Sequence, residues 1–149
     1  MEESFVVDNS VVMSWCFKDE TNHYADVVLD RLSEAKAFAP SIWPLEVANV
    51  LLVAERKKRL SKADSAHFIK LLSQLPIIVE HEQPKNIMTV LLTLARTNNL
   101  SSYDASYLFL SIKKGIPLAT SDTRLMETAK MLNVPIFMSY LNFARKDKK

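Results

Sequence analysis

Four acidic residues from separate parts of the chain are the strongest candidates for chemistry: Asp8, Glu46, Asp104 and Asp122. Asp8 and Asp122 each follow a short apolar run, whereas Glu46 and Asp104 lie near the beginnings of predicted helices. Four carboxylates brought together would form a set of oxygen ligands only. Such a set favours Mg²⁺ or Mn²⁺ over zinc.

The mutual repulsion of such a group would be large. At separations of about 5–7 Å and an effective dielectric constant of about 20, each pair of carboxylates repels by roughly 2–3 kcal/mol. The six pairs together would then oppose folding by on the order of 10 kcal/mol, comparable with the whole stability of a domain. A converged group must therefore bind cations or have strongly raised pKa values.

Each acid also has a purely structural interpretation. Asp8 and Asp122 could cap helix N-termini, and Asp104 completes the capping-box pattern that begins at Ser101. Glu46 would interact favourably with a helix dipole. Taken one at a time, these interpretations are favoured, because helix starts attract acids. The four acids taken together favour a site.

The elements that position these acids alternate between strand and helix. Strands are predicted at 5–7, 37–40, 76–80, 116–120 and 135–137, and helices at 22–36, 42–59, 61–75, 85–98, 102–114 and 123–132. This alternation is typical of an α/β domain around a parallel sheet. In a right-handed βαβ arrangement, helices start at the edge where the strands end. All four acids should therefore lie at the carboxyl edge of the sheet, where open α/β folds bind ligands.

Two helices carry more detailed expectations. The apolar face of the helix at 42–59 is expected to comprise Leu45, Ala48, Leu52 and Val53. The helix at 102–114 should end at Gly115, the only glycine of the chain.

Composition excludes several classes of protein. The 149 residues, 48% hydrophobic, suffice for one domain with a real core. A single glycine excludes glycine-rich phosphate-binding loops, and the single Cys16 cannot form an internal disulfide. The N-terminus lacks the basic region of a secretory signal, and no apolar run is long enough to span a bilayer, so a soluble cytoplasmic protein is expected.

Four motifs in order resemble those of PIN-domain nucleases. They lie at Phe5–Ser10, Pro44–Leu51, Tyr103–Tyr107 and Leu118–Asp122. The size of the chain and its coverage from start to end look like the single-domain, VapC-type toxins of toxin–antitoxin pairs. The resemblance implies a PIN-like three-layer α/β fold, with a parallel sheet of about five strands flanked by helices. Residues 1–149 would form one such nuclease domain, with 145–149 as a frayed basic tail.

The resemblance also implies roles for particular residues. Asp8, Glu46, Asp104 and Asp122 would be the catalytic acids that hold Mg²⁺ or Mn²⁺, with Asp8 and Asp104 as direct ligands. The residues that support this site would be Ser10, Asn49 and Thr120. A departure from many relatives is Asn133, which stands where they carry glycine before the last strand. Asparagine tolerates the left-handed conformation needed there.

The activity implied is metal-assisted hydrolysis of RNA phosphodiester bonds by an endoribonuclease. The substrate would be a structured RNA such as transfer RNA, and the partners would be a cognate antitoxin protein and a second copy of the chain. The net charge is +2, but without the four acids 13 Asp and Glu remain against 19 Lys and Arg. This excess of six positive charges is compatible with an RNA-binding surface.

Other functions remain open. A PIN-fold binding module without catalysis would be favoured by loss of one of the four acids, and none is lost. A nuclease that processes RNA without an antitoxin fits the same residues. A phosphoryl-transfer domain with Asp8 as nucleophile is disfavoured, because the haloacid-dehalogenase pattern needs a second Asp where Ser10 stands.

The remaining candidates for chemistry are weaker. No partner at a suitable spacing is evident for Cys16 or for the histidines, which are expected on the surface: His23, His67 and His81. The aromatic residues near the acids are expected in the core rather than stacked on bases: Trp15, Phe17 and Trp43.

Overall fold

Parallel strands in the order β3-β2-β1-β4 form the central sheet of the computed structural model, which describes residues 2–17, 19–20, 22–81 and 84–140. These strands are β1 (Glu3–Val7), β2 (Ala35–Pro40), β3 (Ile77–Glu80) and β4 (Leu118–Ala119). The α/β class with a parallel sheet is confirmed. Each neighbouring pair of strands is parallel, so every strand ends at the same edge.

The central strand β1 explains the first apolar run. The side chains of Phe5, Val6 and Val7 have no exposed surface. A strand buried on both faces is apolar at consecutive positions rather than at alternate ones. β1 pairs with β2 on one side and with β4 on the other, so the order of strands along the chain reverses at β1.

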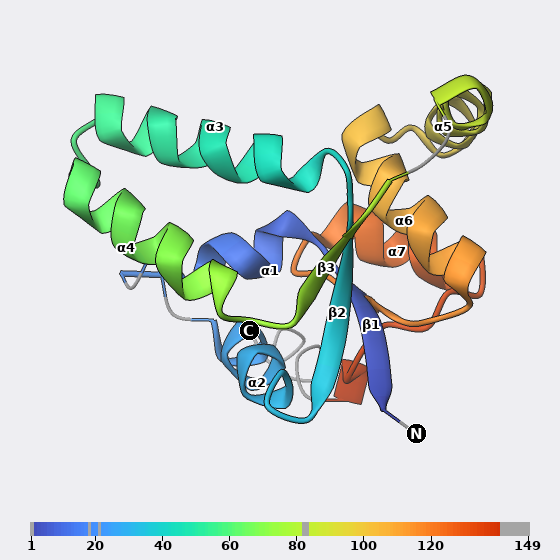
Figure 1. The fold of residues 1–149 in the computed structure, drawn as a ribbon. Helices are drawn as coiled ribbons and strands as arrows, with labels where there is room; N and C mark the ends of the chain where they lie inside the picture. Colours follow the sequence, from blue (N-terminus) through green and yellow to red (C-terminus); the bar gives the residue numbers. More distant parts are fainter. Residues whose placement is uncertain (1, 18, 21, 82–83, 141–149) are drawn as a thin grey trace.

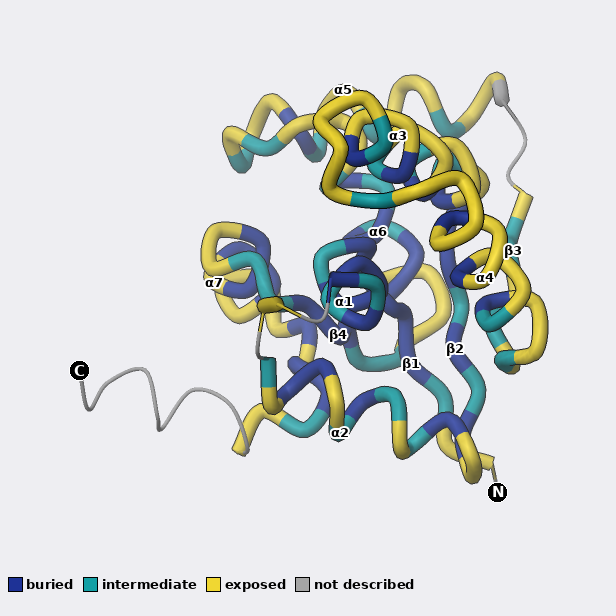
Figure 2. The backbone as a smooth tube through the Cα atoms, turned by 90° about the vertical axis from the view of Figure 1, so that its left-hand side faces the viewer, coloured by how far each residue is buried: buried dark blue, intermediate teal, exposed yellow. Residues whose placement is uncertain are grey.

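Helices cover both faces of the sheet, with α1, α2 and α4 on one side and α5 and α6 on the other (Figure 1). Buried residues are concentrated in the sheet, in α1 and in the inner turns of α6, whereas most residues of α5 are exposed (Figure 2). None of the helices in the described ranges has the length and apolarity that a membrane span requires. The bounds are α1 (Asn9–Ser14), α2 (His23–Arg31), α3 (Trp43–Arg56), α4 (Lys62–Ser73), α5 (Pro84–Asn98), α6 (Ser102–Lys114) and α7 (Thr123–Met131).

Several local signals in the sequence are confirmed. α6 has the predicted bounds, and Gly115 follows it with a left-handed φ of 64°. Ser61 and Asp64 form a complete capping box at the start of α4. Asn133 adopts a φ of 60°, the left-handed conformation expected there.

The predicted boundary between α2 and β2 is wrong. The helix expected at 22–36 ends at Arg31, and the strand begins at Ala35 rather than at 37. Ala35 pairs with Glu3 and Ala37 with Phe5 in the parallel ladder with β1. Pairing between distant segments therefore overrides the local helical spacing.

The predicted apolar face of α3 is also wrong. Leu45 is 65% exposed, Leu52 42% and Val53 38%. The helix buries its other side, and it ends at Arg56 rather than at 59. α3 is apolar on two sides, and its packing against α1 decides which of them is buried. The buried residues are Trp43, Val47, Leu51 and Ala54.

Within the described residues, the sheet has four strands where about five were expected. The strand predicted at 116–120 is reduced to Leu118–Ala119, and that predicted at 135–137 to one parallel bridge between Leu118 and Ile136. Pro117 and Pro135 stand beside these pairs and have no N–H to extend the ladder. Their carbonyl groups still accept from Val6 and Leu118. The tail at 145–149 lies outside the described residues.

Replacing Gly115 tests its role as a helix terminator. A Cβ atom there would meet no atom within 4 Å, so only the left-handed φ opposes a side chain. We expect Gly115→Ala to lower the free energy of unfolding by about 1 kcal/mol in urea denaturation. Gly115→Asn, the matched control, should lower it less, because asparagine tolerates this conformation. Equal losses in both variants would contradict this explanation.

Candidate active site

The carboxyl end of β1 is the point where the strand order reverses, and Asp8 is the first residue beyond it. The neighbouring strand β2 leads to Glu46 in the first turn of α3, and β4 leads to Asp122 at the start of α7. Asp104 lies in the first turn of α6, and α3 and α6 both start beside this end of the sheet, the upper one in Figure 1. Open α/β sheets bind their ligands at such a reversal.

Asp8 is buried, with only 4% of its surface exposed. Its Oδ2 atom accepts hydrogen bonds from the hydroxyl groups of Ser10, at 2.6 Å, and Thr120, at 2.9 Å. Although Asp8 occupies the N-cap position of α1, its side chain caps no backbone N–H group. The capping interpretation is therefore wrong for Asp8. Both bonds end on Oδ2, which leaves Oδ1 for another ligand.

Thr120 connects two of the four acids. Its hydroxyl group donates to Asp8 and accepts from the backbone N–H of Asp122 at 3.0 Å. The Oδ1 atom of Asp122 accepts from the N–H of Leu125 at 3.0 Å, so the capping interpretation is confirmed for this acid. The second carboxylate oxygen of Asp122 is not needed for that cap.

Asp104 differs from the acid at the equivalent position of α4. The carboxylate of Asp64 accepts a hydrogen bond from the N–H of Ser61 at 2.9 Å, which completes that capping box. At α6, the hydroxyl group of Ser101 accepts from the N–H of Asp104, but the N–H of Ser101 does not donate to the Asp104 carboxylate in return. The pattern Ser-x-x-Asp thus forms a complete capping box at α4 and only the serine half of one at α6.

Tyr107, which is not among the predicted site residues, holds the side chain of Glu46. The hydroxyl group of Tyr107 donates to Oε1 of Glu46, and Tyr107 has no exposed surface. Tyr107 follows Asp104 by three positions, so the two share one side of α6. That spacing is the signal that could have identified Tyr107 in the sequence.

The electrostatics place the four acids in one group. Burial raises the pKa of Asp8 to about 6, against the hydrogen bonds from Ser10 and Thr120, and the charges of Asp104 and Glu46 raise it further. Burial also raises the pKa of Glu46, with a contribution from Asp104. The pKa of Asp104 is raised by burial and by the charge of Asp122, while interaction with the Ser101 side chain and, to a smaller extent, the charge of Arg124 lower it. Asp104 is therefore the acid that interacts electrostatically with each of the other three.

The group is not a preformed metal cage. Among the residues that the structure describes, no three Asp, Glu, His or Cys side chains are gathered closely enough to hold a metal ion as placed. The donor chemistry nevertheless suits a hard divalent cation, because the acids that repel one another offer carboxylate oxygens only. Burial and, to a smaller extent, mutual repulsion raise the pKa values of Asp8, Glu46 and Asp104. A bound cation would offset both effects.

Of the three residues expected to support the site, two contact Asp8 and one does not. Ser10 and Thr120 contact Asp8 directly. Asn49 is exposed and lies instead in a cavity of about 470 Å³ that it shares with Glu46.

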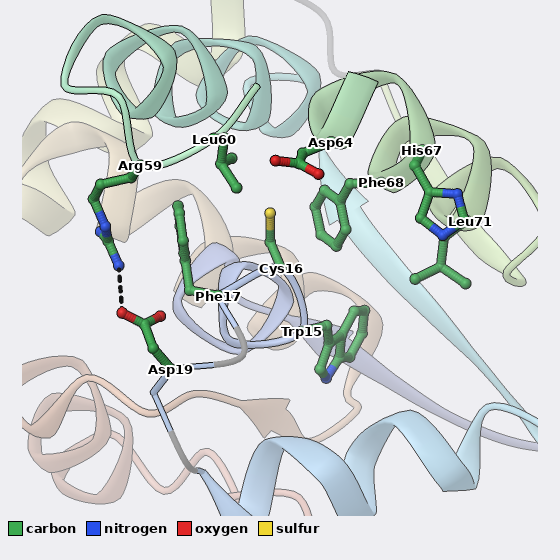
Figure 3. Close-up of a pocket in the computed structure, with 10 residues that line it drawn as sticks. All are labelled: Trp15, Cys16, Phe17, Asp19, Arg59, Leu60, Asp64, His67, Phe68 and Leu71. Atoms are coloured by element: carbon green, nitrogen blue, oxygen red, sulfur yellow. Dashed lines mark ion pairs between the residues drawn. The ribbon is translucent and has the colours of Figure 1, made fainter. Parts of the chain in front are cut away.

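A second cavity, of about 510 Å³, lies between the end of α1 and the first turns of α4 (Figure 3). Cys16 and His67 both line it, but no hydrogen bond joins them, and Figure 3 shows them at separate parts of the wall. Burial and the charge of Asp64 raise the pKa of Cys16, which opposes formation of a reactive thiolate. This cavity therefore gives no support to a Cys–His nucleophile. Arg59 stacks on Phe17 at 4.2 Å from the ring centroid.

The expected exposure of the histidines and the expected burial of the aromatic residues are confirmed. His23, His67 and His81 are exposed. The aromatic residues expected in the core are buried, with 7–8% of their surface exposed: Trp15, Phe17 and Trp43.

Comparison with known proteins identifies the family. The sequence profile described as the PIN domain matches residues 5–131. The chain belongs to the PIN domain family. The match includes all four acids and at least part of every strand of the sheet. No curated protein matches this PIN domain in sequence.

Two solved structures show the same fold. PAE2754 from Pyrobaculum aerophilum is 24% identical, with a TM-score of 0.65, over 86% of this PIN domain and 87% of that chain. FitAcB from Neisseria gonorrhoeae is 18% identical, with a TM-score of 0.60, over 92% of this chain and 99% of that chain. At these identities the likeness concerns the fold.

The buried charge of Asp8 predicts a pH-dependent stability. The folded protein holds the Asp8 proton up to about pH 6, whereas the unfolded chain releases it near pH 3.8. The contribution of Asp8 to the free energy of unfolding is thus fully present below pH 3.8 and is lost as the pH rises through about 6. The total loss is about 3 kcal/mol. Relative to wild type, Asp8→Asn should therefore gain roughly 2–3 kcal/mol between about pH 4 and about pH 7.

Urea denaturation of Asp8→Asn and wild type, at both pH values and in the presence of a metal chelator, measures this gain. The control is Asp30→Asn, at an exposed position of α2. If the stability of Asp8→Asn relative to wild type is the same at both pH values, the raised pKa of Asp8 is refuted.

The bond between Tyr107 and Glu46 can be measured with a double-mutant cycle. We expect Tyr107→Phe and Glu46→Gln to be coupled by about 1 kcal/mol in the free energy of unfolding, below the usual value for a charged acceptor because Glu46 is only half-buried. Additive effects of the two substitutions would show that the bond contributes no stability.

Proposed function

We propose that this PIN domain is a Mg²⁺- or Mn²⁺-dependent endoribonuclease and the toxin of a toxin–antitoxin pair. The observation that carries the proposal is the buried carboxylate of Asp8 at the reversal of the strand order. Two hydroxyl groups bind this carboxylate, and the charges of Asp104 and Glu46 act on it. A carboxylate is kept buried among other acids at a ligand-binding edge when a cation compensates them.

The residues have distinct tasks in this proposal. Asp8 and Asp104 would bind the cation directly, and Asp122 and Glu46 would bind it through water, complete a second ion site or orient the attacking water. When bound, the cation supplies Lewis-acid activation of water and neutralises charge on the phosphate. Ser10 and Thr120 orient Asp8, and Tyr107 orients Glu46, through the hydrogen bonds already described.

RNA is the proposed substrate, with structured RNA such as transfer RNA as the main candidate. The excess of six positive charges outside the four acids supports binding to a polyanion. The proposed partners are an antitoxin protein that covers the acidic site and a second copy of the chain, and the proposed location is the cytoplasm. A short DNA-binding protein encoded beside this chain would support the toxin assignment over a nuclease that works alone.

Cleavage of RNA tests the enzymatic part of the proposal. We expect cleavage to require Mg²⁺ or Mn²⁺, to stop in EDTA, and to fall by more than about 100-fold in Asp8→Asn and in Asp104→Asn, since even residues that only orient metal ligands contribute about 10- to 100-fold. Gel analysis of labelled RNA measures these rates.

The matched control is Asp64→Asn, because Asp64 occupies the same position of a Ser-x-x-Asp pattern in α4. This variant should cleave at the wild-type rate. Undiminished cleavage by folded Asp8→Asn and Asp104→Asn would refute the assignment. Absence of cleavage by wild type on any RNA would favour a binding module.

A further inference from the structure

We propose that the cavity between the starts of α3 and α6 binds one unstacked nucleobase of the RNA, next to the phosphate held at the acids. This inference rests on the proposed nuclease function and names a subsite for its substrate. The cavity, of about 470 Å³, has the size of a small-molecule site. It is lined by Ile42, Leu45, Glu46, Asn49 and Tyr103.

The cavity adjoins the acidic site through two residues of its wall. Glu46, one of the four acids, is itself part of the wall, and Tyr103 is the chain neighbour of Asp104. A base and its phosphate are joined through a single sugar. A phosphate at the acids therefore brings its own or an adjacent base within reach of this cavity.

Exposed apolar groups in the wall are the second argument. Tyr103 is 55% exposed and Leu45 is 65% exposed, so neither side chain contributes mainly to the core. An aromatic ring on the surface offers a face on which any base can stack, and unstacked bases of RNA are commonly bound in this way. Leu45 offers a second apolar surface in the same cavity.

The polar groups of the wall suit a neutral ligand. Among the described residues, no Lys or Arg side chain lines the cavity, so it is not suited to a phosphate group. Asn49 follows Glu46 by three positions and shares its side of α3. Its amide both donates and accepts hydrogen bonds, as the edge of a base requires. A planar, neutral heterocycle satisfies the ring, the apolar surface and the amide together.

The test measures binding separately from cleavage. A labelled single-stranded RNA of about 12 nucleotides is titrated with Asp8→Asn protein, and an abasic nucleotide is placed at each position in turn. One position should weaken binding when abasic. Tyr103→Ala in the same background should weaken binding of the intact RNA by about 5- to 150-fold, the equivalent of about 1–3 kcal/mol for one stacked base.

The decisive result is the combination of the two changes. If Tyr103 stacks on that base, removing the base no longer weakens binding in Tyr103→Ala. In Tyr103→Phe, which keeps the ring, removing the base still weakens binding. Asn49→Ala should reduce the preference among bases at the same position. Tyr140→Ala is the control, since Tyr140 is 74% exposed and does not line the cavity.

An abasic penalty of the same size with and without Tyr103→Ala would overturn the inference while leaving the nuclease assignment intact. Unchanged RNA binding in Tyr103→Ala together with weaker binding of the antitoxin would also overturn it, and would make the cavity a protein-docking site. If neither wild-type protein nor Asp8→Asn binds any RNA, the proposed function and this inference both fail.

Discussion

Burial of the Asp8 carboxylate at the end of β1 is the constraint around which this part of the molecule is arranged. A charged group with 4% of its surface exposed must be compensated by hydrogen bonds or by a cation. Ser10 on α1 and Thr120 after β4 supply two hydroxyl donors, and both end on the same oxygen. Thr120 also accepts from the N–H of Asp122, so the burial of one charge determines how three segments meet.

The acids act as a group because helix starts and strand ends meet at one edge. Each helix start would tolerate a single acid as a cap or a dipole partner. Only Asp122 uses its carboxylate as such a cap, whereas Asp8 binds two hydroxyl groups and Glu46 accepts from Tyr107. The contrast between Asp64 and Asp104 shows that one local pattern serves both purposes. The difference lies in what the rest of the fold places beside each carboxylate.

The two sides of α3 contribute differently to the site. Its buried side anchors the helix against the core, and its first turn presents Glu46 to Asp8 and Asp104. The side with Leu45 and Asn49 remains at the surface beside Tyr103. Apolar residues that the core does not use are thus available next to the acids, which is the physical basis of the proposed base-binding subsite.

The amino-acid sequence by itself determined the elements with strong local signals. The capping box at Ser61, the end of α6 at Gly115 and the left-handed Asn133 depend on bonds and sterics within a few residues. The apolar run of β1 and the alternation of elements sufficed for the parallel fold and for the edge where the acids lie.

Only the tertiary structure decided what depends on contacts between distant segments. The start of β2 at Ala35 follows from its ladder with β1, and the buried side of α3 follows from its packing on α1. The bond from Tyr107 to Glu46 and the burial of Asp8 also arise between segments far apart in the chain. The spacing of Tyr107 from Asp104 indicates a shared side of α6, but local patterns do not specify the distant partner, because hydrogen bonding and burial depend on what the completed fold brings alongside.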